Sequence, residues 1–195
     1  MVAGDMMSLL KLKEYINTGV YLSSFNEFEQ ALLYFDKALA ISPNCEEALN
    51  NKAGALGELG RYEEAIKYFD ILLKLNPNYS DGWYGKANAF AKLREYLKAV
   101  ELYNKALTTY TSQSSKNDFK LADIWCNKGV CFGKLQQHHE AIKCFDTALN
   151  IIHPKHPNRA AIWYNKGMAL YALGSKKEAL ECIDYALQIN PNFQP

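Results

Sequence analysis

A pattern of small and bulky residues recurs along the chain at an interval close to 34 residues, and it constrains the fold more than any other feature. Its most regular marker is an alanine that recurs at successive intervals of 34, 34, 42 and 38 residues: Ala31, Ala65, Ala99, Ala141 and Ala179. Four residues later comes a large apolar residue: Phe35, Phe69, Tyr103, Phe145 and Ile183. Three further on, a small or apolar residue precedes a leucine: Leu39, Leu73, Leu107, Leu149 and Leu187. The chain therefore repeats one structural unit.

The stretch from Glu46 to Tyr79 shows what this unit is. Apolar residues in each half recur at helical spacing, which predicts two amphipathic helices. Gly60 suits the left-handed residue that ends a helix, and Pro77 cannot continue one. The same reasoning predicts helix pairs at 6–23 with 27–41, 46–59 with 62–75, 80–93 with 96–111, 120–135 with 138–152, and 158–173 with 176–189. One hairpin cannot bury both of its faces, so each copy needs neighbours.

A second set of columns lies in the first helix of each pair. The bulky column contains Tyr15, Leu49, Trp83, Trp125 and Trp163. Four residues later comes a small column: Gly19, Ala53, Ala87, Gly129 and Gly167. Together these columns resemble the tetratricopeptide repeat family, whose period is about 34 residues. The resemblance implies an all-α fold, a right-handed α-solenoid superhelix of five helix-turn-helix hairpins.

We therefore expect residues 1–195 to form a single tetratricopeptide array. Its approximate repeats are 12–45, 46–79, 80–121, 122–159 and 160–193. The polar segment 109–120 is an insertion, either tolerated because lengthening a surface loop costs little free energy or serving as a contact loop at one rim. The array departs from the family at the position before the small column, where leucine is usual. This chain has Thr18, Lys52, Lys86, Lys128 and Lys166 there.

Charge and composition exclude several classes of partner. Lys and Arg number 22 against 21 Asp and Glu, giving a net charge of +1, whereas nucleic-acid binding needs a strongly basic face. We expect no nucleic-acid partner. No apolar run is long enough to cross a bilayer, so we expect no membrane partner. Five cysteines scattered through predicted helices favour a reducing compartment, and hence a cytoplasmic location.

The chain carries no recognisable catalytic or metal-binding pattern. Cys126, Cys131, His138, His139 and Cys144 lie close in sequence, but five residues on a helix separate the first two cysteines by about 140°. The histidine pair is expected in a turn, and no Cys-x-x-Cys pair is present. Nucleophile, phosphate-loop and zinc-protease motifs are also missing from the sequence. We expect no enzyme activity, no metal and no cofactor.

What remains is the face of the first helices. In the tetratricopeptide family this face lines the inside of the superhelix and holds peptides, so the resemblance implies a non-enzymatic protein–protein interaction module. Helical spacing places one column opposite the packing residues: Asn17, Asn51, Gly85, Asn127 and Asn165. Asparagine is a mediocre helix former, and its amide can both donate and accept hydrogen bonds. Related arrays hold a peptide backbone with such an asparagine ladder; alternatively, these asparagines merely solvate the helix face.

Aromatic, amide and methionine side chains flank the ladder and are candidate peptide anchors. They are Tyr84, Asn88, Tyr164, Met168 and Tyr171, with Val130 and Lys134 on the same face. The alternative is that the last three anchors help to close the final repeats. Tyr84, Ala161 and Asn165 stand where relatives that clamp a chaperone's terminal carboxylate carry cations. We therefore expect a peptide with apolar side chains and little net charge.

The last predicted helix, 176–189, leaves an apolar flank without a cover. This flank contains Leu180, Ile183, Leu187 and Ile189. Exposed apolar patches usually meet another surface, so the flank predicts either end-to-end self-association as a homo-oligomer or docking of a partner. A function of another class follows. The array would be a recognition or assembly subunit, or a fragment, of a larger enzyme or transport complex.

Overall fold

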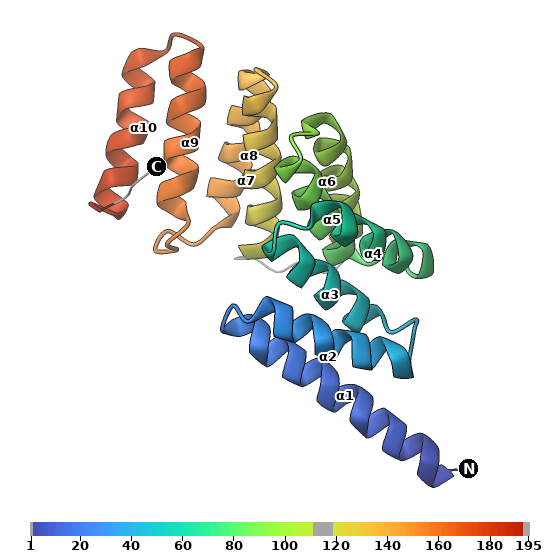
Figure 1. Ribbon diagram of the computed structural model, residues 1–195. Coiled ribbons are helices and arrows are strands. Elements are labelled where there is room, and N and C mark those ends of the chain that lie inside the picture. The colour runs from blue at the N-terminus through green and yellow to red at the C-terminus, as the bar shows by residue number, and fades with distance from the viewer. Residues whose placement is uncertain (1, 111–118, 193–195) are drawn as a thin grey trace. The chain divides into compact units, whose positions relative to one another are not determined.

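The computed structural model describes residues 2–110 and 119–192, with side chains from residue 6 onward. Over these ranges the chain contains ten helices and no strand (Figure 1), so the predicted all-α class is confirmed. The helices group into two compact units, residues 1–93 and 94–195, each described by itself below.

Unit 1 contains five helices that pack in chain order. They are α1 (Val2–Ser24), α2 (Phe28–Ile41), α3 (Glu46–Glu58), α4 (Tyr62–Leu75) and α5 (Ser80–Lys92). The pairs α1/α2 and α3/α4 are helical hairpins, and α2 packs on α3 as α4 packs on α5. The first helices also touch one another, α1 against α3 and α3 against α5. This is the stacking of hairpins expected of a helical solenoid.

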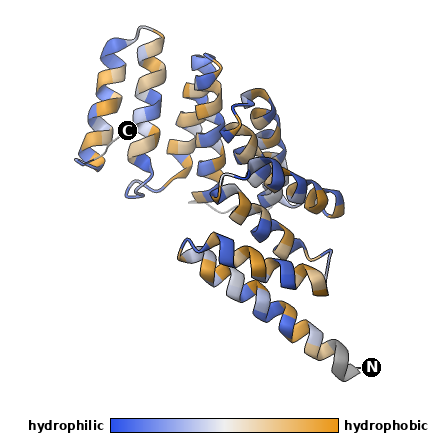
Figure 2. Cartoon of the chain, in the orientation of Figure 1, coloured by the Kyte–Doolittle hydropathy of each residue, from blue (hydrophilic) through white to orange (hydrophobic). Residues whose placement is uncertain are grey.

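Unit 2 repeats the arrangement. It contains α6 (Tyr96–Tyr110), α7 (Phe119–Lys134), α8 (His138–Ile151), α9 (Arg159–Ala172) and α10 (Lys176–Ile189). The pairs α7/α8 and α9/α10 are hairpins, α6 packs on α7, and α8 packs on α9. Figure 2 shows apolar and polar bands alternating along these helices, as amphipathic helices require.

The predicted helix pairs are confirmed to within about two residues, except that α1 begins at Val2 rather than near residue 6. The polar insertion predicted at 109–120 lies largely outside the described residues. At its ends, Thr109 and Tyr110 are the last two residues of α6, and Phe119 and Lys120 are the first two residues of α7.

The packing columns have the burial that their residue types predict. All five alanines of the first column are fully buried at 0% exposure: Ala31, Ala65, Ala99, Ala141 and Ala179. At Gly19 a β-carbon would overlap the ring of Phe35, and at Gly129 it would lie 2.8 Å from the ring of Phe145. At these two positions the small residue is therefore required by the close approach of the two helices within a hairpin.

The lysines that replace the family's leucine join successive hairpins. Lys52 on α3 pairs with Asp36 on α2 and donates a 2.6 Å hydrogen bond to the hydroxyl of Tyr68 on α4. Burial lowers the pKa of the Lys52 ammonium, but the hydrogen bonds to Asp36 and Tyr68 more than offset it, and the net pKa is raised. The departure from the family pattern thus places an ion pair between one hairpin and the next.

The same ion pair recurs twice more. Lys86 on α5 pairs with Asp70 on α4 at 2.5 Å, and Lys166 on α9 pairs with Asp146 on α8 at 2.6 Å. In every case the carboxylate comes from a second helix and the ammonium from the first helix that follows. Each of these pairs therefore links one hairpin to the next at the same repeat position.

A left-handed residue closes the turn at the same repeat position between first and second helices. These residues are Asn26, Gly60, Arg94, Gln136 and Gly174, with φ between 60° and 86°. At Gly60 the next amide, that of Arg61, donates a 2.9 Å hydrogen bond to the carbonyl of Leu56, which is the Schellman arrangement. The turn predicted at Gly60 is confirmed, and Gly174 forms the equivalent turn of the last hairpin.

Candidate peptide-binding surface

The four ladder asparagines lie on first helices, but their surroundings differ. Asn17 on α1 is exposed, whereas Asn51, Asn127 and Asn165 are half-buried. At the third position of the column, Gly85 on α5, a β-carbon would overlap the ring of Phe69 on α4. At this position the first helix therefore lies so close to the preceding second helix that only glycine fits without displacing the ring.

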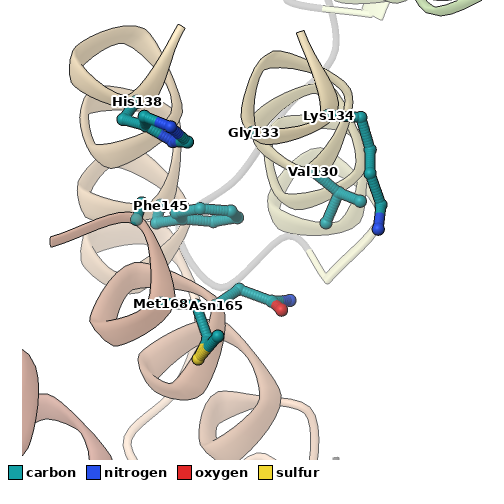
Figure 3. A pocket seen from close by; sticks show the side chains of 8 residues that line it. Val130, Gly133, Lys134, His138, Phe145, Asn165 and Met168 are labelled. Carbon is teal, nitrogen blue, oxygen red and sulfur yellow. The ribbon is translucent and has the colours of Figure 1, made fainter. Parts of the chain in front are cut away.

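Asn165 borders a hollow of about 170 Å³ at the junction of three helices of unit 2 (Figure 3). Helix α7 contributes Val130, Gly133 and Lys134, α8 contributes His138 and Phe145, and α9 contributes Asn165, Met168 and Ala169. Four of these residues belong to the face predicted to hold a peptide: Val130, Lys134, Asn165 and Met168. The structure therefore brings part of the predicted surface together around one concavity.

The inner wall of the hollow is apolar. Phe145 is 2% exposed and Ala169 is 6% exposed, and Figure 3 shows the Phe145 ring extending from α8 between the neighbouring helices. Val130 is half-buried, and no atom lies within 4 Å of where a β-carbon at Gly133 would be. These groups offer an apolar side chain van der Waals contact and removal from water.

Polar groups stand around this apolar wall. His138 is the first residue of α8, and its Nδ1 atom is buried without a hydrogen-bond partner among the described residues. In Figure 3 the imidazole extends toward the hollow, with the amide of Asn165 and the side chain of Lys134 at its other edges. A buried ring nitrogen costs free energy unless a water molecule or another polar group forms a hydrogen bond with it.

Asn165 also contacts α7 through a hydrogen bond with the Cys126 thiol. Burial raises the pKa of Cys126 to about 12. The hydrogen bond with Asn165 lowers this pKa, but by less than burial raises it. Burial likewise raises the pKa of Cys131 and of Cys144 to about 11. These thiols stay protonated at neutral pH, whereas nucleophilic and metal-binding cysteines need a thiolate.

The remaining predicted anchors divide between the two units. Tyr84 and Asn88 are half-buried on α5, and Tyr164 is half-buried on α9. Met168 is 45% exposed and borders the hollow, whereas Tyr171 is 57% exposed and does not. The described residues thus include one concavity that uses predicted anchors, formed by α7, α8 and α9.

Sequence reasoning missed His138 because it placed both histidines in a turn. That placement is wrong: His138 and His139 are the first two residues of α8. The signal was available in the repeat, since the equivalent positions of the three preceding repeats carry the aromatic residues Phe28, Tyr62 and Tyr96. An imidazole at a position that carries Phe or Tyr in those three repeats marks a place where the hydrogen-bonding groups differ.

The α10 flank is exposed over most of its predicted residues. Leu180 is 61% exposed, Leu187 42% and Ile189 38%. Ile183 is half-buried, because its side chain meets Gly167 of α9, where a β-carbon would lie 3.1 Å away. The apolar stripe is therefore present on α10 as predicted.

Comparison with known proteins gives the family. Models described as "Tetratricopeptide repeat" match residues 17–79, 50–114 and 120–191. The chain belongs to the tetratricopeptide repeat family. Proteins of this family are generally non-catalytic interaction modules that bind protein partners. No match is found among curated proteins.

Solved structures of tetratricopeptide repeat proteins have the same fold. The PilF protein of Pseudomonas aeruginosa aligns with a TM-score of 0.81 at 16% identity, over 96% of this chain and 79% of that chain. The MamA protein of Desulfovibrio magneticus aligns at 0.78 and 21% identity, over 95% and 98%. YrrB, described as a TPR protein with an unusual peptide-binding site, aligns at 0.69 and 25% identity, over 91% and 86%.

A search of the described helices for membrane spans finds none that combines the length and apolar character needed to cross a bilayer.

Proposed function

We propose that the protein is a non-enzymatic binding module that holds a peptide segment of a protein partner along its first helices. In this proposal Asn17, Asn51, Asn127 and Asn165 contact the peptide backbone, and the hollow in unit 2 receives one apolar side chain. The remaining candidate anchors are Tyr84, Asn88, Tyr164, Met168 and Tyr171. The segmentation into five repeats of a single array remains part of the proposal.

The observation that carries the proposal is the buried, unpartnered Nδ1 of His138 beside the half-buried amide of Asn165. Two polar groups that can each form a hydrogen bond stand at the edge of an apolar wall made by Phe145, Val130 and Ala169. A peptide offers both an apolar side chain and backbone amide groups in adjacent positions, which fits this combination.

The size of the hollow supports a peptide side chain over a free small molecule. Sites that bury drug-sized ligands usually measure roughly 300–1,000 Å³, whereas this hollow measures about 170 Å³. Affinity would therefore come from several modest contacts spread along a segment. The peptide-binding site described for YrrB, in a similar fold, points the same way.

The absence of catalysis and the cytoplasmic location are further parts of the proposal. Catalysis by a cysteine nucleophile is disfavoured by the raised pKa values of Cys126, Cys131 and Cys144, and the cytoplasmic location is supported by the five free cysteines. Buried thiols that pack as small apolar groups are compatible with a reducing compartment.

A peptide-display selection tests the function directly. Random twelve-residue peptides selected on the wild-type protein are expected to be rich in apolar residues and low in net charge. Their affinity should fall about tenfold or more in His138→Phe, which replaces Nδ1 with an apolar ring atom, and in Asn165→Ala, which removes the amide. Fluorescence anisotropy of the selected peptides measures the change.

The neighbouring histidine supplies the matched control. His139→Phe makes the same substitution at the next residue of α8, which is exposed and does not line the hollow. Its binding should equal that of wild type, and circular dichroism should show all variants folded. Selected peptides that bind His138→Phe, Asn165→Ala and wild type equally would refute the proposal.

A second candidate function is that of an assembly subunit of a larger complex, favoured by the exposed stripe on α10. It does not compete with peptide binding, because the two surfaces involve different residues.

A further inference from the structure

We propose that the outer face of α10 is a docking site for a helix from a partner protein, and that this helix presents a lysine between an apolar residue and a small one. The docking face consists of Leu180, Ile183, Asp184 and Leu187, which recur at i, i+3, i+4 and i+7 and so form one stripe of the helix. The inference is independent of the proposed peptide-binding site on α7, α8 and α9.

The junction between α8 and α9 shows how such a face is normally covered. On α8 the equivalent residues are Ile142, Phe145, Asp146 and Leu149. Phe145 and Leu149 are 2% and 7% exposed and share a buried cluster with residues of α9. Asp146 pairs with Lys166 of α9 at 2.6 Å. A first helix therefore buries the apolar stripe and neutralises the carboxylate at once.

On α10 neither the apolar stripe nor the carboxylate is covered in the same way. Leu187 is 42% exposed, whereas its equivalents Leu73, Leu107 and Leu149 are 6–7% exposed. Asp184 occupies the position at which Asp36, Asp70 and Asp146 each hold a lysine of the following helix. Asp184 itself is exposed and forms no ion pair within residues 2–110 and 119–192. The face therefore presents both the apolar stripe and the carboxylate that a first helix covers at the other junctions.

The covered junctions also define the chemistry of the occupant. Each covering helix presents an apolar or small residue, a lysine four positions later, and a small residue three positions after that. The four instances are Ala48-Lys52-Ala55, Gly82-Lys86-Ala89, Ile124-Lys128-Cys131 and Ile162-Lys166-Ala169. The first residue and the last are buried in all four, which is why they are small or apolar. The lysine meets the carboxylate where one is present.

Helix α1 of a second copy does not fit this pattern. Its three equivalent residues are Glu14, Thr18 and Tyr21, and Tyr21 is 64% exposed. Docking α1 on α10 would bury a carboxylate near Asp184, supply no cation and place a large ring where small residues belong. Like charges brought together at an interface are costly. The face therefore favours a helix that carries the lysine pattern over α1 of a second copy.

A synthetic peptide tests the docking face. The probe is a fluorescein-labelled peptide with the sequence of residues 158–174, which carries the Ile162-Lys166-Ala169 pattern, stapled on its outer face to hold the helix. We expect saturable binding to the intact protein by fluorescence anisotropy. Asp184→Lys should weaken it about fivefold or more, and Leu187→Glu at least as much. A probe with glutamate in place of its lysine should regain affinity for Asp184→Lys.

Glu178 provides the matched control, because it is an exposed carboxylate on the opposite side of α10. Glu178→Lys should bind the original probe as wild type does. Equal binding of the probe to wild type and to Asp184→Lys would overturn the proposal, as would no saturable binding to wild type. Light scattering that shows wild-type self-association abolished by Leu187→Glu would also overturn it, since a second copy would then be the occupant.

The docking proposal and the peptide-binding proposal fail separately. His138→Phe should leave binding of the helical probe unchanged, and Leu187→Glu should leave binding of display-selected peptides unchanged.

Discussion

The same repeat position is closed in one unit and open in the other. In unit 1 the ladder position of α5 is Gly85, and the ring of Phe69 lies against it so closely that a β-carbon would overlap the ring. In unit 2 the ladder position of α9 is Asn165, and a hollow opens over the equivalent ring, Phe145. Both repeats fill the core with an aromatic ring, while the residue facing the ring decides whether space remains.

Two other positions around the ring also differ between the two units. Unit 1 has Glu58 and Tyr62 where unit 2 has Lys134 and His138. The open position in unit 2 is therefore bordered by an ammonium group and an imidazole, whereas the closed position in unit 1 carries a carboxylate and a phenol. A repeat fold can thus build its core with one set of columns and vary recognition with another.

The largest test of this comparison is truncation of the two rings. Phe69→Ala should lower the free energy of unfolding by about 3–5 kcal/mol, as expected for a buried ring that is 3% exposed. Phe145→Ala, at a ring that is 2% exposed, should cost less, because the hollow beside it already leaves part of the ring without packing partners. Urea unfolding followed by circular dichroism measures both. A larger loss for Phe145→Ala would contradict the comparison.

Exchanging the ladder residues comes next in size. Gly85→Asn should lower the free energy of unfolding by about 1–3 kcal/mol, because its β-carbon must displace Phe69. The control is Gly54→Asn, at a helical glycine with open space where the β-carbon would go. It should be neutral or slightly stabilising, because glycine is a poor helix former. Equal destabilisation by both substitutions would show that Gly85 is not closed against the ring.

Lysines at equivalent junctions offer a third contrast. Lys52 pairs with Asp36 and Tyr68. Lys128 instead lies over the ring of Trp125 at 4.5 Å, and the residue at the usual aspartate position is Asn104. Lys52→Met should cost about 1–2 kcal/mol by removing charged hydrogen bonds. Lys128→Met should cost less than about 1 kcal/mol. Thermal unfolding of the two variants would contradict this if Lys128→Met lowered Tm more.

The smallest expected effect concerns the hairpin turns. Gln136 adopts a left-handed φ of 60°, which side chains other than glycine and asparagine adopt at a cost. Gln136→Gly should raise stability by up to about 1 kcal/mol, and Gly60→Ala, at φ 76°, should lower it by a similar amount. Differential scanning calorimetry would show the opposite shifts in Tm. A fall in Tm for Gln136→Gly would mean that the turn is set by other contacts.

Most of the fold follows from the sequence, because the features that build it are local and repeated. The spacing of the repeat alone identified the columns that contain Ala141 and Gly129. The turn was indicated by Gly60. The partners of Lys52 and Lys86 were not foreseen. Their aspartates lie 16 residues earlier on another helix, and only the packing of one hairpin on the next reveals the pair.

The candidate site was foreseen only in part for a related reason. Asn165, Met168 and Val130 were found because they share a helix face, which helical spacing predicts. His138 and Phe145 come from the second helix of the hairpin, and their approach to that face depends on how α8 packs between α7 and α9. Spacing within one helix carries no information about such a three-helix junction.

The most direct test of the central claim is the ring nitrogen signal of His138. With ¹⁵N-labelled histidine, addition of a display-selected peptide should shift the Nδ1 resonance of His138, assigned by comparison with His138→Phe, while the resonances of His139 stay in place. Saturable peptide binding with no change at His138 would contradict the account, because the hollow would then take no part in recognition.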